Sequence, residues 1–175
     1  MIRLTRIGHV LLRVADVERS KAFYRDLLGF RVAEEDPAHG GVFMTLGDDF
    51  HTLDIAQHPT PDTADSPTRT RLGVAHIAFL VPSYQALREA YETLLNHGVT
   101  IDRAVDHVNQ RSIYVADLDG NRLEIYYEMT GALQRFPEGR GDGDFVLPVS
   151  RPGEPLPEWL SERWPAAVTA SASSR

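Results

Sequence analysis

Two matching segments decide the fold: Ile7-Gly8-His9-Val10, and Val74-Ala75-His76-Ile77, which lies 67 residues further along the chain. A second match joins Leu53-Asp54-Ile55 to Leu123-Glu124-Ile125 at an offset of 70 residues. Fused repeats keep a nearly fixed spacing between equivalent residues, and three extra residues in the loops of the second copy would account for the difference. The chain is therefore predicted to contain two copies of one structural unit.

Each copy reads as a strand, a helix and three further strands. Residues 7–14 and 74–81 are rich in apolar and β-branched side chains, and apolar residues then recur at helical spacing. Asp16 and Ser83 stand where helix N-caps are expected. We therefore predict an α+β fold, in which two β-α-β-β-β modules form one cup-shaped, mixed and mostly antiparallel sheet with the helices outside.

The sequence divides into three parts. Residues 1–66 are predicted to form the first module and residues 67–129 the second, and the two together make one domain. Six of the eleven prolines follow Met129, so residues 130–175 are predicted to be an irregular, proline-rich arm. We expect the aromatic side chains of this arm to help wall the pocket.

Composition restricts the partners. The 175 residues carry 18 basic and 25 acidic side chains, and this net charge of −7 argues against nucleic acid or an anionic membrane as the partner. No apolar run approaches the roughly 18 residues needed to cross a bilayer, and the first residues lack a signal-peptide core, so we expect a cytoplasmic protein. The absence of cysteine means that any metal must be held by His, Asp or Glu. We therefore expect a small molecule as the partner, and the sequence does not decide whether the chain forms a homo-oligomer.

Strand alternation directs three such side chains to the same side of the predicted cup. The helices are expected to cover the wholly apolar faces, which turns His9, His76 and Glu124 towards the concave side. A lone His or Glu in a strand is more often a hydrogen-bonded structural residue than a metal ligand. The matched positions of the two histidines in the repeat nevertheless favour a metal site. Two imidazoles and one carboxylate are the ligands of a non-haem Fe(II) facial triad.

These features resemble the vicinal oxygen chelate superfamily, which includes glyoxalase I, extradiol ring-cleaving dioxygenases, methylmalonyl-CoA epimerase and the bleomycin-resistance binding proteins. The resemblance covers residues 5–128. It implies that His9, His76 and Glu124 bind one divalent ion, which would be Fe(II) or alternatively Mn(II).

A narrower resemblance is carried by residues 105–124, VDHVNQRSIYVADLDGNRLE. This stretch is similar to the signature of type I extradiol dioxygenases, except that Leu118 stands where the family usually has proline. The segment His51-Thr52-Leu53 also resembles the one that carries the catalytic histidine of those enzymes. The resemblance implies that His51 is the acid/base residue and that His107 and Tyr114 line the pocket and bond to the substrate. The implied reaction is Fe(II)-dependent cleavage of a catechol-type ring by O2, as in aromatic catabolism.

Asp54 keeps a different activity open. It aligns with Glu124 in the repeat, and glyoxalase I-like enzymes place a fourth ligand there, in a site suited to Ni(II) or Zn(II). On a regular strand His51 and Asp54, which are three residues apart, cannot face the same way, so one of them should point away from the metal. A glyoxalase I-like or epimerase metalloenzyme is therefore one alternative. A metal-free small-molecule (drug) binding protein is another, because resistance proteins use the same cup without catalysis.

Overall fold

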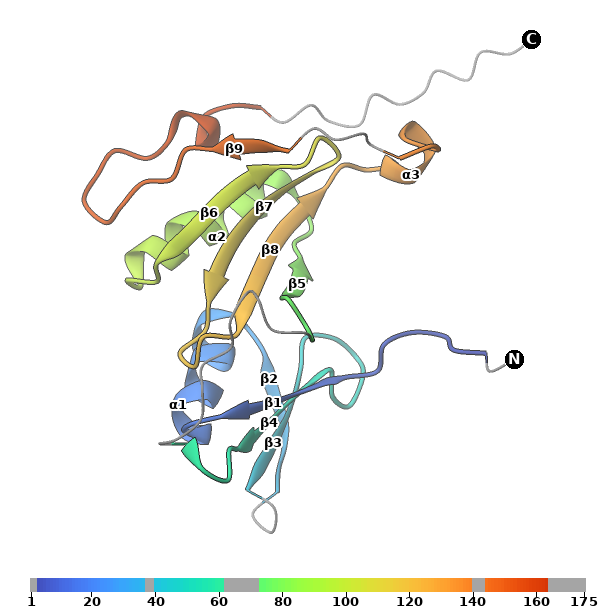
Figure 1. The fold of residues 1–175 in the computed structure, drawn as a ribbon, viewed down its shortest axis with the longest axis vertical. Coiled ribbons are helices and arrows are strands. Elements are labelled where there is room, and N and C mark those ends of the chain that lie inside the picture. The colour runs from blue at the N-terminus through green and yellow to red at the C-terminus, as the bar shows by residue number, and fades with distance from the viewer. Residues whose placement is uncertain (1–2, 37–39, 62–72, 140–143, 164–175) are drawn as a thin grey trace. The chain divides into compact units, whose positions relative to one another are not determined.

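The computed structural model describes residues 3–36, 40–61, 73–139 and 144–163 (Figure 1). The chain forms two compact units. The first comprises residues up to 71 together with the turn 117–121, and the second comprises residues 72–116 and 122–175. Each unit contains one β-sheet and a helix that packs on it.

The first unit has the element order β-α-β-β-β (Figure 1). Its elements are β1 (Val10–Val14), α1 (Val17–Ala22), which continues as a π-helical turn over Phe23–Leu27, β2 (Arg31–Asp36), β3 (Gly41–Thr45) and β4 (Leu53–Gln57). The strands are ordered β1-β4-β3-β2, with β1 parallel to β4 and the other neighbours antiparallel. Asp16 caps α1 as expected, because its side chain accepts a hydrogen bond from the N–H of Arg19.

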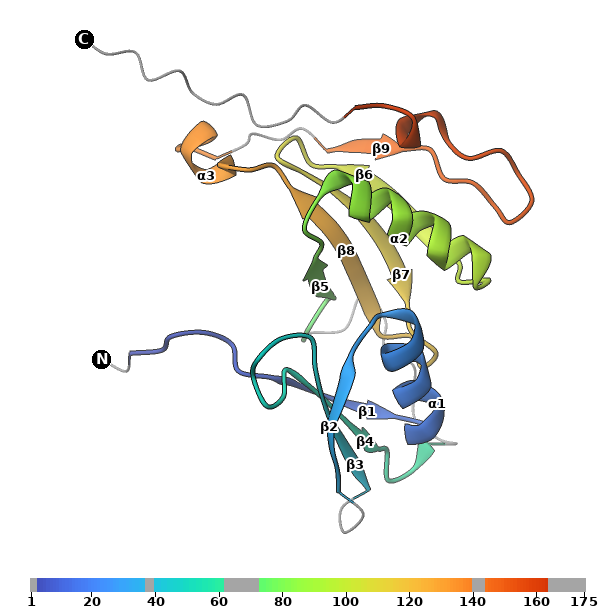
Figure 2. The same cartoon turned by 180° about the vertical axis from the view of Figure 1, so that it is seen from behind.

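Apolar side chains between α1 and the sheet form the core of the first unit. Val14, Tyr24, Met44 and Ile55 are completely buried. Figure 2 shows α1 against one face of this sheet, and its contacts are with β3 and β4. Burial of this apolar face fixes which side chains of the strands point the other way.

The second unit repeats this order and extends it. Its elements are β5 (Ile77–Leu80), α2 (Tyr84–Asn96), β6 (Ile101–Asp106), β7 (Gln110–Ala116), β8 (Arg122–Glu128), α3 (Ala132–Arg135), β9 (Phe145–Leu147) and a 3-10 turn over Glu158–Leu160. The strand order is β5-β8-β7-β6-β9, with β5 parallel to β8 and the other neighbours antiparallel. Helix α2 covers one face of this sheet (Figure 2), where Ile113, Val115 and Leu123 are completely buried.

The register confirms that the two units are copies of one pattern. Leu11 of β1 pairs with Asp54 of β4, and the equivalent Ala78 of β5 pairs with Glu124 of β8. The α+β class and the two β-α-β-β-β modules are confirmed. In one respect the described strands differ from the prediction: they form separate sheets of four and five strands rather than one shared sheet. Alternation of apolar residues specifies the strands of a module, but it does not say which edges pair.

The segment after Met129 is docked on the second unit. Strand β9 pairs antiparallel with β6. Trp159 is 2% exposed, and its ring meets Tyr91 of α2 edge to face with 5.2 Å between centroids. The Tyr84 hydroxyl donates a 2.6 Å hydrogen bond to the carbonyl of Trp159, whose indole N–H donates to the carbonyl of Pro148 at 2.7 Å. The described part of this segment thus contains a strand, and the division of the chain at residues 66 and 129 stays a prediction.

Among the described residues, no helix combines the length and the apolar character that a membrane crossing requires.

Candidate functional site

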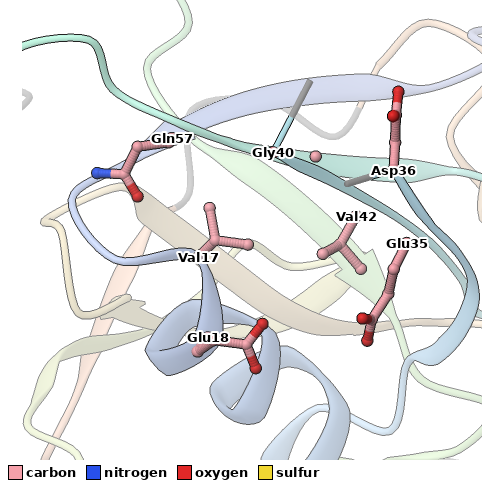
Figure 3. Close-up of a pocket in the computed structure, with 8 residues that line it drawn as sticks. Val17, Glu18, Glu35, Asp36, Gly40, Val42 and Gln57 are labelled. Atoms are coloured by element: carbon pink, nitrogen blue, oxygen red, sulfur yellow. The ribbon is translucent and has the colours of Figure 1, made fainter. Parts of the chain in front are cut away.

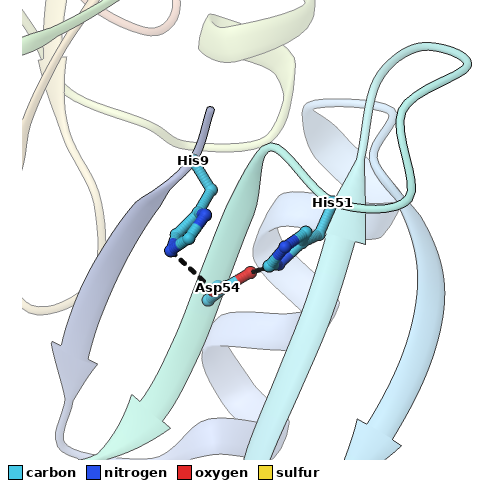
Figure 4. A group of neighbouring side chains, drawn as sticks. All are labelled: His9, His51 and Asp54. Carbon is cyan, nitrogen blue, oxygen red and sulfur yellow. Dashed lines mark hydrogen bonds and ion pairs between the residues drawn. The ribbon is translucent and has the colours of Figure 1, made fainter. Parts of the chain in front are cut away.

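Three polar side chains gather on the first unit: His9, His51 and Asp54 (Figure 4). The Oδ1 atom of Asp54 lies 2.6 Å from Nδ1 of His51, and its Oδ2 atom lies 3.6 Å from Nε2 of His9. The two imidazoles stack with 4.5 Å between their centroids. One candidate ligand atom from each residue lies within 4.8 Å of the others, so this group could hold a metal ion.

Local chain geometry explains why His51 and Asp54 meet. Strand β4 begins at Leu53, and His51 lies in the loop that leads into it. The alternation rule for a regular strand therefore does not apply, and the expectation that the two side chains cannot face the same way is wrong. Which of the two would point away from a metal stays a prediction. His9 likewise lies one residue before β1, and its ring points towards Asp54 (Figure 4).

Glu124 is the centre of a second cluster, on the second unit. Its side chain is 5% exposed, and its Oε2 atom lies 2.9 Å from Nε2 of His76. Its Oε1 atom accepts hydrogen bonds from the Tyr114 hydroxyl at 3.0 Å and from the side-chain amide of Gln110 at 3.2 Å. Nε2 of His107 lies 3.0 Å from the same hydroxyl. Strand pairing produces this arrangement, because Tyr114 of β7 is directly opposite Glu124 of β8.

The surroundings of Tyr114 keep its hydroxyl protonated. Burial raises the pKa of Tyr114 to about 12, and the adjacent carboxylate of Glu124 acts in the same direction. The guanidinium of Arg103, which lies over the ring, acts in the opposite direction on this pKa. At neutral pH Tyr114 is therefore a hydrogen-bond donor.

His107 connects this cluster to the chain that follows β8. Its Nδ1 atom lies 2.7 Å from Oδ1 of Asp144, the residue before β9. A hydrogen-bonded series therefore runs from Asp144 to Glu124 through two side chains. Sequence reasoning missed Asp144, because one acid in a proline-rich segment has no spacing that relates it to a histidine 37 residues earlier.

Leu118, which stands where the signature usually has proline, lies in the turn 117–121. The carboxylate of Asp117 accepts hydrogen bonds from the backbone N–H groups of Asp119 and Asn121, at 3.0 and 2.8 Å. Asp side chains that bond to the backbone a few residues further on are typical of turns. The side chain of Asp117 thus stabilises the turn in which Leu118 lies.

Both clusters have the chemistry of a site for a divalent ion. Each contains a carboxylate that is more than nine-tenths buried, since the side chain of Asp54 is 8% exposed and that of Glu124 is 5% exposed. In the described part of the chain, no Lys or Arg forms an ion pair with either carboxylate, and imidazole nitrogens contact them instead. A buried carboxylate without a cation is costly, and these nitrogen and oxygen ligands suit first-row divalent ions. The residues therefore fit a metal.

Comparison with known proteins shows the superfamily to which the chain belongs. The model of the Glyoxalase/Bleomycin resistance protein/Dioxygenase superfamily matches residues 6–125. The chain belongs to this superfamily. A superfamily domain from Frankia sp. EAN1pec, a crystal structure with 21% sequence identity, has the same fold with a TM-score of 0.63 over 76% of this chain and 98% of that chain.

The relatives within the superfamily differ in activity. The catechol-2,3-dioxygenase of Bacillus subtilis (strain 168) is 30% identical over 70% of this chain and 41% of its own length. Biphenyl-2,3-diol 1,2-dioxygenase 3 of Rhodococcus globerulus is 29% identical over 69% of this chain and 62% of its own length. A metallothiol transferase FosB of Staphylococcus haemolyticus is 31% identical over 73% of this chain and 85% of its own length. The chain thus spans less than two thirds of either dioxygenase.

The ligands expected of a superfamily member fall into the two clusters. The second unit brings His76 into contact with Glu124, and the first unit stacks His9 on His51. Binding of one ion by His9, His76 and Glu124 stays a prediction. Sequence reasoning found all four residues through the repeat and the superfamily resemblance.

Two pockets open on the first unit. The larger, of about 500 Å³, is lined by Val17, Glu18, Glu35, Asp36, Gly40, Gly41, Val42 and Gln57 (Figure 3). It contains none of the predicted site residues, and Lys21 forms ion pairs with two of its acids. The smaller, of about 370 Å³, is lined by Leu11, Arg13, Asp36, Gly41, Phe43, Asp54, Ile55 and Ala56. This smaller pocket reaches Asp54, and its volume suits a small molecule.

Proposed function

We propose that the protein is an extradiol dioxygenase that holds Fe(II) and cleaves the ring of a catechol-type substrate with O2. The observation that carries the proposal is the hydrogen-bonded series of Glu124, Tyr114 and His107. It places a protonated hydroxyl and an imidazole beside a buried carboxylate, so groups that can donate and accept protons adjoin a candidate metal ligand. The similarity to two diol dioxygenases supports the same chemistry.

His9, His76 and Glu124 would hold the metal as two imidazoles and one carboxylate. When bound, Fe(II) would supply the positions at which the two oxygens of the diol and O2 meet. Mn(II) is the alternative for the same set of ligands.

His51 would move protons. A carboxylate only accepts hydrogen bonds, so the 2.6 Å contact with Asp54 fixes a proton on Nδ1 of His51 and leaves Nε2 for the substrate. His51 can then accept a proton from a substrate hydroxyl and return it as the ring opens. In this role Asp54 orients His51. This accounts for the burial of Asp54, and Asp54 need not be a metal ligand.

Tyr114 and His107 would hold the substrate. The Tyr114 hydroxyl keeps its proton at neutral pH, and it would turn this proton from Glu124 to an oxygen of the diol or of the ring-opened product when the substrate binds. His107 contacts that hydroxyl through Nε2, so it orients the donor and can exchange a proton with it.

A second function is favoured by the position of Asp54. In the register of the first sheet it occupies the place that Glu124 occupies in the second, and it belongs to the group that could hold an ion. Four protein ligands, with Asp54 added to the trio, would suit Ni(II) or Zn(II) and a glyoxalase I-like or epimerase reaction. The short contact with His51 favours the dioxygenase, because it already engages one oxygen of Asp54.

A metal-free drug-binding protein is the third candidate. The buried carboxylates of Asp54 and Glu124, which form no ion pair with Lys or Arg in the described residues, argue against it.

The test is anaerobic reconstitution with Fe(II), followed by O2 and a panel of catechols. The dioxygenase should bind stoichiometric iron and form a yellow muconic semialdehyde, which is followed by its visible absorbance. A protein that ignores every catechol but isomerises a hemithioacetal with Ni(II) would be glyoxalase-like. A protein that takes up no metal even after reconstitution would be a binding protein.

A further inference from the structure

A β-bulge turns Arg103 towards the cluster around Glu124. In the ladder between β6 and β7, Arg103 pairs with Tyr114, and the register shifts by one residue just before this pair. Without the shift Arg103 would pair with Ile113, which is completely buried on the face that α2 covers. The bulge thus places the guanidinium on the face that carries the site.

Arg103 stands in a row with two residues of the site. Tyr114 is its partner on β7, and Glu124 is the partner of Tyr114 on β8. The guanidinium carbon of Arg103 lies 4.2 Å from the centroid of the Tyr114 ring. A guanidinium that lies over an aromatic face can keep the N–H groups along its edge for another partner.

Arg103 forms no ion pair with a carboxylate within the described ranges. Its Nε atom is buried and has no hydrogen-bond partner there. Two other arginines of the same sheet differ, because Arg111 pairs with Asp106 at 3.1 Å and Arg122 pairs with Asp102 at 3.4 Å. A buried donor without a partner costs free energy.

The repeat shows that the bulge does not require a cation. Strand β2 has the same register shift against β3, and Glu34 occupies the equivalent position, opposite Phe43. An acid stands there in the first unit and Arg103 in the second, so the fold accepts either charge. The fold therefore does not explain why this position carries an arginine, and we look for the reason in ligand binding.

We propose that Arg103 binds an anionic group of the substrate, and that this substrate is a catechol bearing a carboxylate on the ring or on a short side chain. The diol part of this inference rests on the proposed function. The carboxylate part follows from the guanidinium, whose planar pair of donors matches a carboxylate in two parallel hydrogen bonds. A neutral catechol would leave those donors unpaired and should bind more weakly.

The inference is tested by anaerobic calorimetry on the Fe(II)-loaded protein, which measures binding without turnover. Two matched pairs of ligands are compared: 3,4-dihydroxybenzoate with 4-methylcatechol, and benzoate with benzamide, which lack the diol. We expect the acid of each pair to bind about 10–100-fold more tightly, which equals about 1.4–2.8 kcal/mol at about 1.4 kcal/mol per tenfold change.

Three variants assign the preference to one side chain. Arg103→Gln should abolish the tighter binding of the acids. Arg103→Lys should keep only part of this preference, because an ammonium retains the charge but not the planar pair of donors. Arg88→Gln is the matched control, since it removes the same charge from α2, on the covered face of the sheet, and should leave the preference intact. Circular dichroism checks that each variant folds.

The outcomes separate this inference from the proposed function. Ring cleavage without a preference for acids, or a preference that Arg103→Gln leaves unchanged, would overturn the role of Arg103 and leave the dioxygenase standing. A preference that depends on Arg103, in a protein that cleaves no catechol, would support the anion site and reject the dioxygenase. If Arg103→Gln fails to fold, a reduced preference in Arg103→Lys supports the inference and an unchanged one overturns it.

Discussion

The hydrogen-bonded series around Glu124 can be broken at its centre by Tyr114→Phe, which removes one oxygen atom and keeps the ring. Tyr114 is 4% exposed, and its hydroxyl donates to Glu124 at 3.0 Å and lies 3.0 Å from Nε2 of His107. A hydrogen bond to a charged group contributes about 1.5–3 kcal/mol and a neutral one about 0.5–1.5 kcal/mol. Because Gln110 still donates to the carboxylate at 3.2 Å, we expect the free energy of unfolding to fall by about 2–3 kcal/mol.

Urea unfolding of the metal-free protein measures this loss. Tyr126→Phe is the matched control, because Tyr126 lies on β8 and its hydroxyl has no hydrogen-bond partner among the described residues. Its free energy of unfolding should change by less than about 0.5 kcal/mol. Equal stability of Tyr114→Phe and the wild type would refute the hydrogen-bonded series.

Tyr114 also makes the stability of the folded chain depend on pH. The pKa of Tyr114 is raised to about 12 in the folded chain, against about 10 in the unfolded chain. The folded chain therefore keeps a proton that the unfolded chain loses, so this stabilisation is complete below pH of about 10 and disappears as the pH rises to about 12. Titration of phenolate absorbance should show one tyrosine ionising near pH 12, which Tyr114→Phe removes.

Two further substitutions test the histidines. His51→Asn should leave iron bound but slow catechol cleavage by at least about 10²-fold, because a positioned acid/base group typically contributes about 10²–10⁴-fold, and normal cleavage would remove His51 from the mechanism. Asp144→Ala should lower kcat by only about 1.4–5-fold, because its side chain is 55% exposed and exposed ion pairs contribute about 0.2–1 kcal/mol. It should also move the ¹⁵N resonance of Nδ1 in His107, and an unmoved resonance would show that the contact is absent in solution.

The repeat made the topology predictable, because equivalent residues at a fixed offset must serve equivalent places in two modules. The pairing of Leu11 with Asp54 and of Ala78 with Glu124 bears this out. Whether the two modules share one sheet or form two could not be predicted in this way. It depends on backbone hydrogen bonds between edge strands of the two modules, and these leave no trace in the pattern of side chains.

The site was predictable where regular alternation holds and not where it breaks. Alternation along β8 places Glu124 away from the apolar face, as expected. It fails at His51, which lies in a loop, and at Arg103, where a bulge shifts the phase of β6 by one residue. Asp144 depends on a distant segment folding back, which no local period encodes.

The affinity of His76→Ala for Fe(II), measured by anaerobic titration, tests most directly whether His9, His76 and Glu124 hold one ion. Loss of an outer-shell partner alone typically costs about 10–100-fold in metal affinity, so loss of a true ligand should raise the Kd by more than about 100-fold. His51→Ala, measured beside it, should bind Fe(II) nearly as tightly as the wild type. The opposite result, with Fe(II) lost in His51→Ala and retained in His76→Ala, would show that the cluster on the first unit binds the ion without Glu124 and would contradict the proposed ligand set.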